Sequence, residues 1–434
     1  MGAMGWVLVL VLAACPAPVR AGAAFAGMGG VGVGIADPSC ELADNPASAA
    51  ATGVDRAAGV VHLAGGVTRL TFAGRVYNEF TTTTGSFPAT WGLGWTAVTP
   101  DLNEGRVGLG IWQVDRHVFS VDEPLDRSLP AAPGGPALSD SFDAGRTRVR
   151  QDEALYAAGG VWIQPLGDGD QQIAAGVLYL NQTGRGRLEV TAEETTTGNT
   201  QPLRDMNSRK DISGFGMIVG YFYRPLPDGS LGVGLTYLGP LAGHIWEQDS
   251  GGPLFTDHAE RPAQMRIGIG GSFKVTTGLI VAVDMRYAGE IRGSATLFGG
   301  TARARAVQEF SDATFAIHAG MEYRLPLFLG EMPLRVGYFN RPDPLPASTA
   351  GAGSGAVSGF LLPSVKQDVT GFTIGTGFSR MSLAVDVALQ WLLVNTHTKL
   401  LLPGASAPVD SGDVRSTVAA VASVTLRFGP KALD

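Results

Sequence analysis

Apolar and polar residues alternate along this chain from about residue 57 to its end, and no part of that stretch sustains the 3.6-residue repeat of a helix. In the segment LIVAVDMRY, residues 279–287, every odd position is apolar, whereas the even positions include Asp284 and Arg286. The same pattern recurs in 315–324 and 383–391. Because side chains of a strand point to opposite faces in turn, the pattern predicts an all-β chain with one strongly apolar face.

The connections between the alternating segments are short and long in turn. Short ones are expected at 167–170, 227–230, 276–278 and near 380–382, and long ones at 121–146, 191–211, 247–260, 293–311, 344–366 and 398–413. Outer-membrane barrels have short periplasmic turns and long outer loops, which a soluble sandwich has no reason to copy. We therefore expect a transmembrane antiparallel β-barrel of about 14 strands over residues 57–428.

The expected strands are 58–70, 90–100, 104–120, 147–164, 171–190, 212–226, 229–246, 261–275, 278–292, 312–326, 333–343, 367–380, 383–397 and 414–428. An even number brings both ends of the chain to the same side of the membrane. A closed sheet also pairs every backbone N–H and C=O group, as hydrocarbon surroundings require.

The composition excludes one class of partner. Charged residues make up 16% of the chain, well below the roughly 25% of soluble proteins, and the formal net charge is −7. No basic cluster is present, so a nucleic-acid partner is not expected.

The N-terminus has the features of an export signal. An apolar run from Met4 to Cys15 is followed by small residues, which predicts a signal peptide over residues 1–21. The alternative is a lipoprotein, because LAAC at 12–15 resembles a lipidation box with Cys15 as the acylated residue. In either case Cys40 has no partner for a disulfide, and no cysteine-based metal site is expected.

A glycine-rich stretch follows the signal. Gly27, Gly29 and Gly32 fit the spacing G-x-G-x-x-G, which in dinucleotide-binding proteins cradles a pyrophosphate. That function requires a strand before the glycines and a helix after them, and the sequence predicts neither.

No residue pattern indicates catalysis, a metal or another cofactor. The six histidines are scattered without metal-ligand spacing, and no G-x-S-x-G motif is present. Carboxylates expected on the inner face are Asp284, Glu322 and Asp386, and arginines that could match them are Arg266, Arg286 and Arg324. We interpret these groups as lumen charges, not as an acid–base pair of an enzyme.

Two expected outer loops carry apolar clusters. They are Phe360, Leu361 and Leu362 in SGFLLP, and Leu400, Leu401 and Leu402 in TKLLLPG. They could be strand ends at the membrane interface, or they could form an apolar landing site for a hydrophobic ligand.

Several motifs resemble the FadL/TodX family of outer-membrane transporters for long-chain fatty acids and aromatic hydrocarbons. The stretch with Gly-Met-Gly at 27–29 and Asn-Pro-Ala at 45–47 looks like the N-terminal hatch of that family. PLRVGY at 333–338 is similar to a strand of the family that precedes a proline-containing outer loop. Cys40 and Pro38 interrupt the hatch pattern, and the loops match no family motif.

The resemblance implies a barrel with residues 22–56 as a plug in its lumen and 429–434 as a C-terminal tail. The hatch residues would be Gly27, Gly29, Gly30, Asp37, Asn45, Pro46 and Ala47, and candidate lumen contacts with the ligand are Arg266, Arg286, Arg324 and His318. The protein would sit in the outer membrane of a Gram-negative bacterium, in contact with its lipids, as a monomer. It would take up hydrophobic small molecules passively and release them sideways into the membrane.

Two other hypotheses remain open at this stage. The same barrel could act as a scaffold or shuttle for secreted proteins, with the outer loops as the binding surface. Alternatively, the chain could be an exported soluble or lipid-anchored β protein whose apolar face is an internal core.

Overall fold

The computed structural model describes most of the chain, in sixteen ranges. These are residues 23–36, 42–50, 57–76, 79–99, 105–125, 142–167, 169–194, 200–249, 254–299, 302–311, 313–328, 330–344, 347–350, 364–380, 383–400 and 409–428. The signal peptide, Asp37, Cys40 and the tail 429–434 lie outside them, so the predictions on these residues stay predictions.

Nearly all of the described chain is strand. The two short helices are α2 (Ala23–Gly27) and the 3-10 helix η2 (Ser48–Ala50). The strands are β1 (Ala57–Val76), β2 (Glu79–Val98), β3 (Arg106–Leu125), β4 (Phe142–Leu166), β5 (Gln171–Glu194), β6 (Thr200–Leu226), β7 (Gly229–Asp249), β8 (Leu254–Arg261), β9 (Gln264–Lys274), β10 (Leu279–Ala288), β11 (Ile291–Gly299), β12 (Ala302–Ser311), β13 (Thr314–Leu327), β14 (Gly330–Pro344), β15 (Ala347–Ala350), β16 (Ser364–Arg380), β17 (Leu383–Leu400) and β18 (Val409–Phe428).

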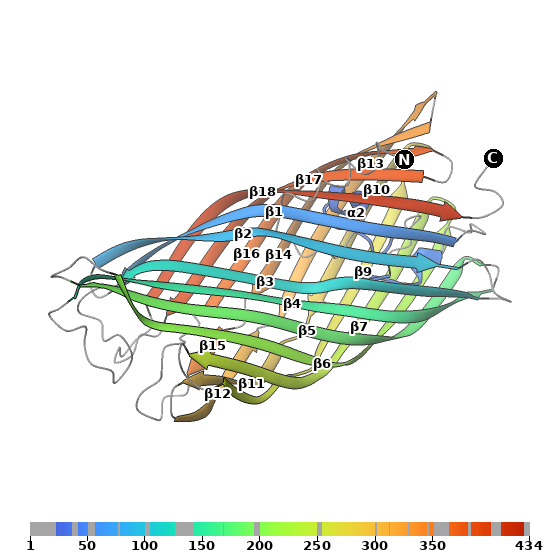
Figure 1. Ribbon diagram of the computed structural model, residues 1–434. Helices are drawn as coiled ribbons and strands as arrows, with labels where there is room; N and C mark the ends of the chain where they lie inside the picture. Colours follow the sequence, from blue (N-terminus) through green and yellow to red (C-terminus); the bar gives the residue numbers. More distant parts are fainter. Residues whose placement is uncertain are drawn as a thin grey trace, which may run out of the picture.

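One antiparallel sheet closes on itself to form the barrel (Figure 1). Its order runs from β6 back to β1, on to β18, and then through β17, β16, β14, β13, β10, β9 and β7, where the pairing of β7 with β6 closes the ring. Fourteen described strands make up this ring, as predicted. Strand β8 is not part of the ring and pairs with the second half of β7, from Leu241 to Gln248. The first and last strands pair from Ala57↔Phe428 to Gly66↔Ala419, so neither leaves a free edge there.

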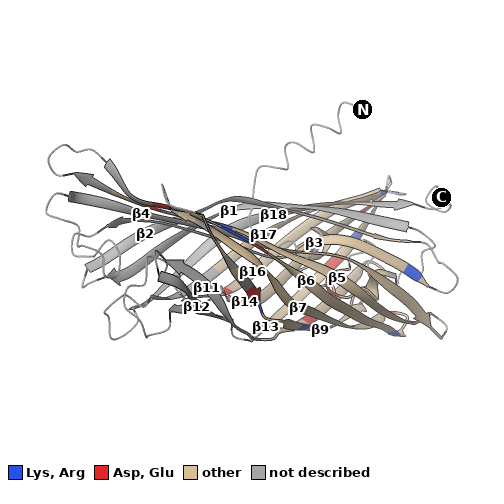
Figure 2. Ribbon diagram, turned by 60° about the horizontal axis from the view of Figure 1, so that its bottom comes forward, with Lys and Arg blue, Asp and Glu red and all other residues tan. Residues whose placement is uncertain are grey.

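The alternation of residues places apolar side chains on the outside of the barrel, as expected. On β10, Val283 and Met285 are each 47% exposed, whereas Asp284 between them is fully buried. Tyr287 on β10 and Ile317 on β13 are also exposed. Charged residues occupy few positions on the described strands (Figure 2). The outer surface is therefore an apolar band of the kind that faces lipid in membrane barrels.

The two ends of the barrel differ. The end at which β4–β5, β6–β7, β9–β10 and β13–β14 are joined is called the turn end here, and the opposite end is the loop end. The first residue of β1, Ala57, and the last residue of β18, Phe428, also lie at the turn end. The predicted turns at 167–170, 227–230 and 276–278 lie there.

At the loop end the prediction of long loops needs correction. The stretch 191–211 continues β5 to Glu194 and starts β6 at Thr200, and 293–311 forms most of β11 and β12. The small sheet β11-β12-β15 also belongs to this end, at lower left in Figure 1. The alternation of apolar and polar residues is weaker in these stretches because strands that extend beyond the membrane do not need apolar side chains on their outer face.

Candidate functional site in the barrel lumen

The described N-terminal segment, residues 23–36 and 42–50, lies inside the barrel near its turn end (Figure 1). Helix α2 starts against β18, where the backbone N–H of Ala23 donates to Ser423 Oγ at 3.1 Å. The Thr373 hydroxyl on β16 accepts from the backbone N–H of Gly29 at 2.9 Å and donates to the Gly27 carbonyl at 2.8 Å. These contacts fix the helix and the turn that follows it to one wall.

Glycines allow the backbone of the segment to lie directly on the wall. Gly29 and Gly30 have φ of 76° and 83°, values that side chains rarely tolerate, so the chain can turn sharply after α2. The facing barrel strands also carry glycines at the contact. A Cβ on Gly337 would lie 2.1 Å from the Gly29 nitrogen, and a Cβ on Gly232 would lie 1.9 Å from the Val33 carbonyl oxygen. Such glycines mark a close approach of another backbone.

A charged cluster on β10 holds the middle of the segment. Asp284 Oδ2 accepts hydrogen bonds from the backbone N–H groups of Gly32 at 2.6 Å and Val33 at 2.9 Å. Arg286 Nη2 donates to Asp44 Oδ2 at 2.9 Å, to Asp284 Oδ2 at 3.3 Å, and to the Gly30 carbonyl. Burial strengthens these charge-assisted contacts because water competes for them less.

The Asn-Pro-Ala motif anchors the second part of the segment. Asn45 is 1% exposed, and its amide nitrogen donates to the Val33 carbonyl at 2.8 Å and to the Tyr221 carbonyl at 3.0 Å. Its side-chain oxygen accepts from the backbone N–H of Ala47 at 3.1 Å. Asn45 thus joins the two parts of the segment to each other and to β6.

The four candidate ligand contacts have different surroundings. His318 Nδ1 donates to the Gly29 carbonyl at 2.6 Å, and its ring stacks on Phe339 at a centroid distance of 5.7 Å. Arg266 donates to Gln264 Oε1. In this arrangement His318 and Arg286 contact the N-terminal segment, whereas Arg324 faces a cavity.

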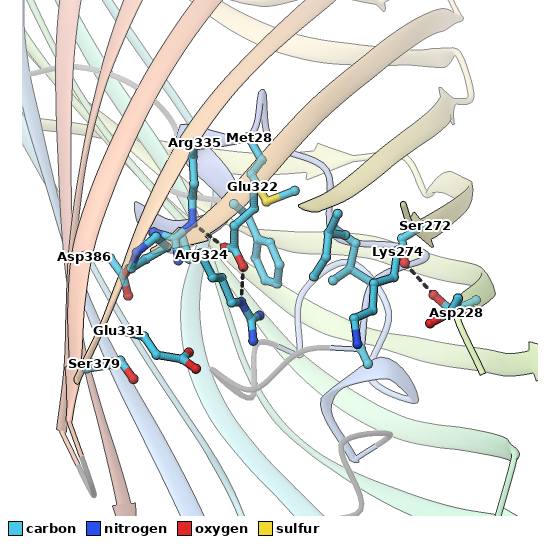
Figure 3. A pocket seen from close by; sticks show the side chains of 18 of the residues that line it. Met28, Asp228, Ser272, Lys274, Glu322, Arg324, Glu331, Arg335, Ser379 and Asp386 are labelled. Atoms are coloured by element: carbon cyan, nitrogen blue, oxygen red, sulfur yellow. Dashed lines mark hydrogen bonds and ion pairs between the residues drawn. The ribbon is translucent and has the colours of Figure 1, made fainter. Parts of the chain in front are cut away.

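That cavity lies between the segment and the turn end, with a volume of about 340 Å³ (Figure 3). The segment contributes Phe25, Met28 and Ile35 to its wall. Across from them runs a chain of ion pairs, in which Arg324 Nε donates to Glu322 at 2.6 Å and Arg335 donates to Glu322 at 2.7 Å and to Asp386 at 2.6 Å. The expected lumen carboxylates Glu322 and Asp386 are therefore matched by arginines.

An apolar cluster covers the inner face of β3 to β7, although the sequence pattern did not predict one there. Its members include Trp112, Val114, Leu155, Leu178, Leu180, Ile212, Phe222 and Leu241, and Leu42, Ala47 and Ala49 of the N-terminal segment belong to it. Here both faces of the strands are apolar, so alternation alone could not reveal the inner one. A run of large apolar residues at consecutive inward positions, such as Leu178 and Leu180, is the signal that could have revealed the apolar inner face.

The wall has a seam between β2 and β3. These strands pair from Trp95↔Ile111 to Val98↔Gly108, whereas β3 pairs with β4 from Arg106 to Leu125. Just beyond the end of the β2–β3 ladder, β3 has an irregularity between Gln113 and Asp115. Farther along, β2 has another between Phe87 and Thr90, where it pairs with Thr68 and Gly66 of β1. Bulges of this kind end pairing and bend the strand.

The proposed landing site falls almost wholly outside the described residues. Phe360, Leu361, Leu362, Leu401 and Leu402 are not described, and Leu400 is the last residue of β17.

Within the described ranges, no group of three or more His, Cys, Asp or Glu residues could hold a metal ion. No helix of the described chain is long and apolar enough to cross a membrane.

Comparison of the whole chain with known proteins gives a consistent result at the level of structure. No family model and no curated protein sequence matches. A Pseudomonas aeruginosa FadL homologue has a TM-score of 0.60 at 14% identity, with 96% of this chain and 99% of that chain covered. The Pseudomonas putida toluene transporter TodX has a TM-score of 0.55 at 14% identity, with 94% and 98% covered.

The chain has the FadL/TodX barrel fold. The Ralstonia pickettii toluene transporter TbuX agrees, with a TM-score of 0.54 at 13% identity over 94% of this chain and 98% of that chain. The FadL/TodX fold is that of a Gram-negative outer-membrane β-barrel, as the apolar outer band indicates. The alternative of a soluble β protein with an internal apolar core does not fit this fold.

Proposed function

We propose that this FadL/TodX-type barrel is a passive outer-membrane channel for hydrophobic small molecules, with its turn end toward the periplasm. The observation that carries the proposal is the apolar cluster on the inner face of β3 to β7, which meets the N-terminal segment at Leu42, Ala47 and Ala49. A lumen filled with water and salt would not need such a wall. Two of the barrels with the same fold, TbuX and TodX, are toluene transporters.

The energetics favour entry of apolar molecules. Removing apolar surface from water gains about 25 cal/mol per Å², so an apolar lumen attracts a hydrocarbon without any energy source. The lipopolysaccharide leaflet resists the same molecules, and a protein path around it would speed uptake.

The N-terminal segment acts as the plug in this proposal. Its contacts with the wall combine packing of buried apolar side chains with hydrogen bonds to backbone groups, such as those of Asp284 to Gly32 and Val33. A neutral hydrogen bond is worth on the order of 1 kcal/mol net and one to a charged group about 1.5–3 kcal/mol. A ligand that enters between the segment and the apolar cluster therefore needs to break only a few of these contacts to displace part of the segment. The flexible backbone at Gly29 and Gly30 allows the shift.

The exit is the seam between β2 and β3. Beyond Trp95↔Ile111 the two strands no longer pair, so the wall can part there without breaking a hydrogen-bonded ladder. The neighbouring residues Trp112 and Val114 belong to the apolar cluster, and Ile111 faces outward with 52% exposure. Apolar residues therefore border the seam on the lumen side and on the lipid side.

Uptake of radiolabelled toluene by intact Gram-negative cells that lack other hydrophobic-compound channels tests the proposal. Cells that make this protein should accumulate toluene several-fold faster than cells that do not, and deletion of residues 23–50 should change that rate. Uptake of a polar solute of similar size serves as the control for a generally leaky membrane. Equal toluene uptake with and without the protein would refute the channel.

A further inference from the structure

Two arginines face each other on the outer surface of the barrel, toward its loop end. Arg185 of β5 and Arg209 of β6 are direct partners in the strand ladder, and both side chains are exposed. On the other side of β5, Arg185 pairs with Asp152 of β4, whose side chain lies outside the described part of the chain. Like charges directly opposite each other destabilise a sheet. A bound anion between the two guanidinium groups would remove that cost.

The neighbouring carboxylates leave this arginine pair largely unmatched. Arg187 Nε and Nη2 donate to the two carboxylate oxygens of Asp205 at 3.0 Å each, so that Asp205 is already occupied. Asp211 Oδ2 lies 3.9 Å from Arg209 Nη2, which is beyond hydrogen-bond distance. Arg185 forms no hydrogen bond or ion pair with any residue in the described ranges. Both members of the pair therefore have N–H groups available for a ligand.

The outer surface of β5 changes from apolar to polar between the membrane band and these arginines. Val177 and Tyr179 are exposed, and the ring of Tyr179 packs edge to face on Phe215 of β6 at a centroid distance of 5.9 Å. Farther along, the exposed residues are Thr183 and then Arg185. Aromatic girdles mark the interfaces of membrane barrels, and six residues of a strand tilted by about 40° rise about 15 Å. Arg185 therefore lies just outside the hydrocarbon, among the head groups and sugars of the leaflet at the loop end.

An indole ring lies beside the arginine pair. Trp246 of β7 is the ladder partner of Arg209, and the Arg209 guanidinium carbon lies 5.6 Å from the centroid of the indole ring. This cation–π contact orients the guanidinium group on the outer face. The ring itself is apolar with one N–H donor, which suits the boundary between acyl chains and sugars.

We propose that Arg185 and Arg209, with Trp246 beside them, bind a phosphate group of lipopolysaccharide in the outer leaflet. Lipopolysaccharide fills that leaflet in Gram-negative bacteria and carries phosphates on its lipid A sugars. A guanidinium group binds phosphate through two parallel N–H···O bonds, so one phosphate between two arginines replaces their repulsion by attraction. The inference uses the orientation in the proposed function, with the loop end outward, but does not depend on transport.

The test measures the affinity of the full-length protein in detergent micelles for fluorescently labelled lipopolysaccharide. Arg185→Gln/Arg209→Gln should weaken binding by about tenfold or more, the change expected when charge-assisted hydrogen bonds are lost. The matched control is Arg187→Gln, on the same strand and face, because Asp205 occupies this guanidinium group. Its affinity should stay within about twofold of the unchanged protein. Unchanged affinity in a folded double variant, or an equal loss in the control, would overturn the inference.

A second measurement uses the unchanged protein and does not depend on the folding of a variant. Lipopolysaccharide from which a phosphatase has removed the lipid A phosphates should bind about tenfold or more weakly than the intact glycolipid. Equal binding of the two forms would overturn the inference. Inorganic phosphate that binds as tightly as lipopolysaccharide would show a site for free anions and contradict the assignment to the glycolipid. Failure of toluene uptake would refute the channel and leave these binding results unaffected.

Discussion

The carboxylate of Asp284 lies 2.6 Å from the backbone nitrogen of Gly32, although 252 residues separate them in the chain. The same oxygen accepts from Val33 and from Arg286, which in turn binds Asp44. One buried side chain on β10 thus organises the centre of the N-terminal segment. The strength of this contact should decide how readily the segment leaves the lumen.

Replacing Asp284 by Asn should loosen the N-terminal segment while leaving the barrel intact. Asn keeps one acceptor oxygen but loses the charge that strengthens the hydrogen bonds and balances Arg286, with a cost of about 1.5–3 kcal/mol. Amide hydrogen exchange of residues 23–36 should become faster by tenfold or more, whereas exchange in β13 should not change. Unaltered protection of Gly32 and Val33 would contradict this prediction.

The wall glycines should be needed for the segment to seat. In Gly232→Ala the new Cβ would lie 1.9 Å from the Val33 carbonyl oxygen, a backbone atom that cannot move away by rotation. The segment should shift from the wall and become accessible to protease. In the matched variant Gly271→Ala, the nearest atom is Leu231 Cδ2 at 3.2 Å, the end of a flexible side chain. If both variants are cleaved at the same rate, the wall glycines do not serve the segment.

The ion-pair chain near the turn end should stabilise the barrel. Arg335 is buried between Glu322 and Asp386, so Arg335→Met removes the cation that the two carboxylates share and leaves Glu322 with Arg324 alone, at a cost of about 3–5 kcal/mol. Adding Glu322→Gln and Asp386→Asn should recover much of that loss. Denaturant unfolding followed on heat-modifiable gels measures both effects.

The exposed pair Arg187–Asp205 provides the control for that series. Their side chains are 53% and 28% exposed, so Arg187→Met should leave the unfolding midpoint unchanged. A midpoint shift of the same size for Arg187→Met and Arg335→Met would show that the effect comes from the loss of any arginine, and not from a buried network.

The outer apolar band makes a prediction about the membrane. Met285 faces outward on β10, so Met285→Arg should place a charge in lipid and destabilise the barrel by about 2–4 kcal/mol if it lies near the bilayer centre. Leu254→Arg on β8, at the loop end, should cost about 0–1 kcal/mol because it lies outside the hydrocarbon. Equal yields of folded barrel for the two variants would place Met285 outside the membrane.

The barrel was predictable from sequence because lipid imposes a strict rule on every second residue. The alternation at 279–287 and the turns at 167–170 and 227–230 predicted the number of strands in the ring. The contacts in the lumen were harder to predict, because inward side chains pack against one another and do not all face the same solvent. The contact of His318 with Gly29 depends on how two distant segments meet, and the expected contact of His318 with ligand stays a prediction.

The seam could not be found in the sequence at all. Pairing between β2 and β3 ends at Trp95↔Ile111, although both strands continue for many residues. The local preference for a strand is satisfied in both β2 and β3, and only the pairing between the two strands reveals where their ladder ends.

Locking the N-terminal segment to the wall tests the central claim most directly. Ala23 and Ser423 are in contact, so Ala23→Cys/Ser423→Cys, in a background in which Cys40 is serine, should form a disulfide between α2 and β18. A disulfide between the directly paired His244→Cys and His258→Cys, outside the lumen, is the control. We predict that oxidation of the first pair reduces toluene uptake to the level of cells without the protein and that reduction restores it. Uptake that is equally fast in the oxidised and reduced states would contradict the account of a plugged channel.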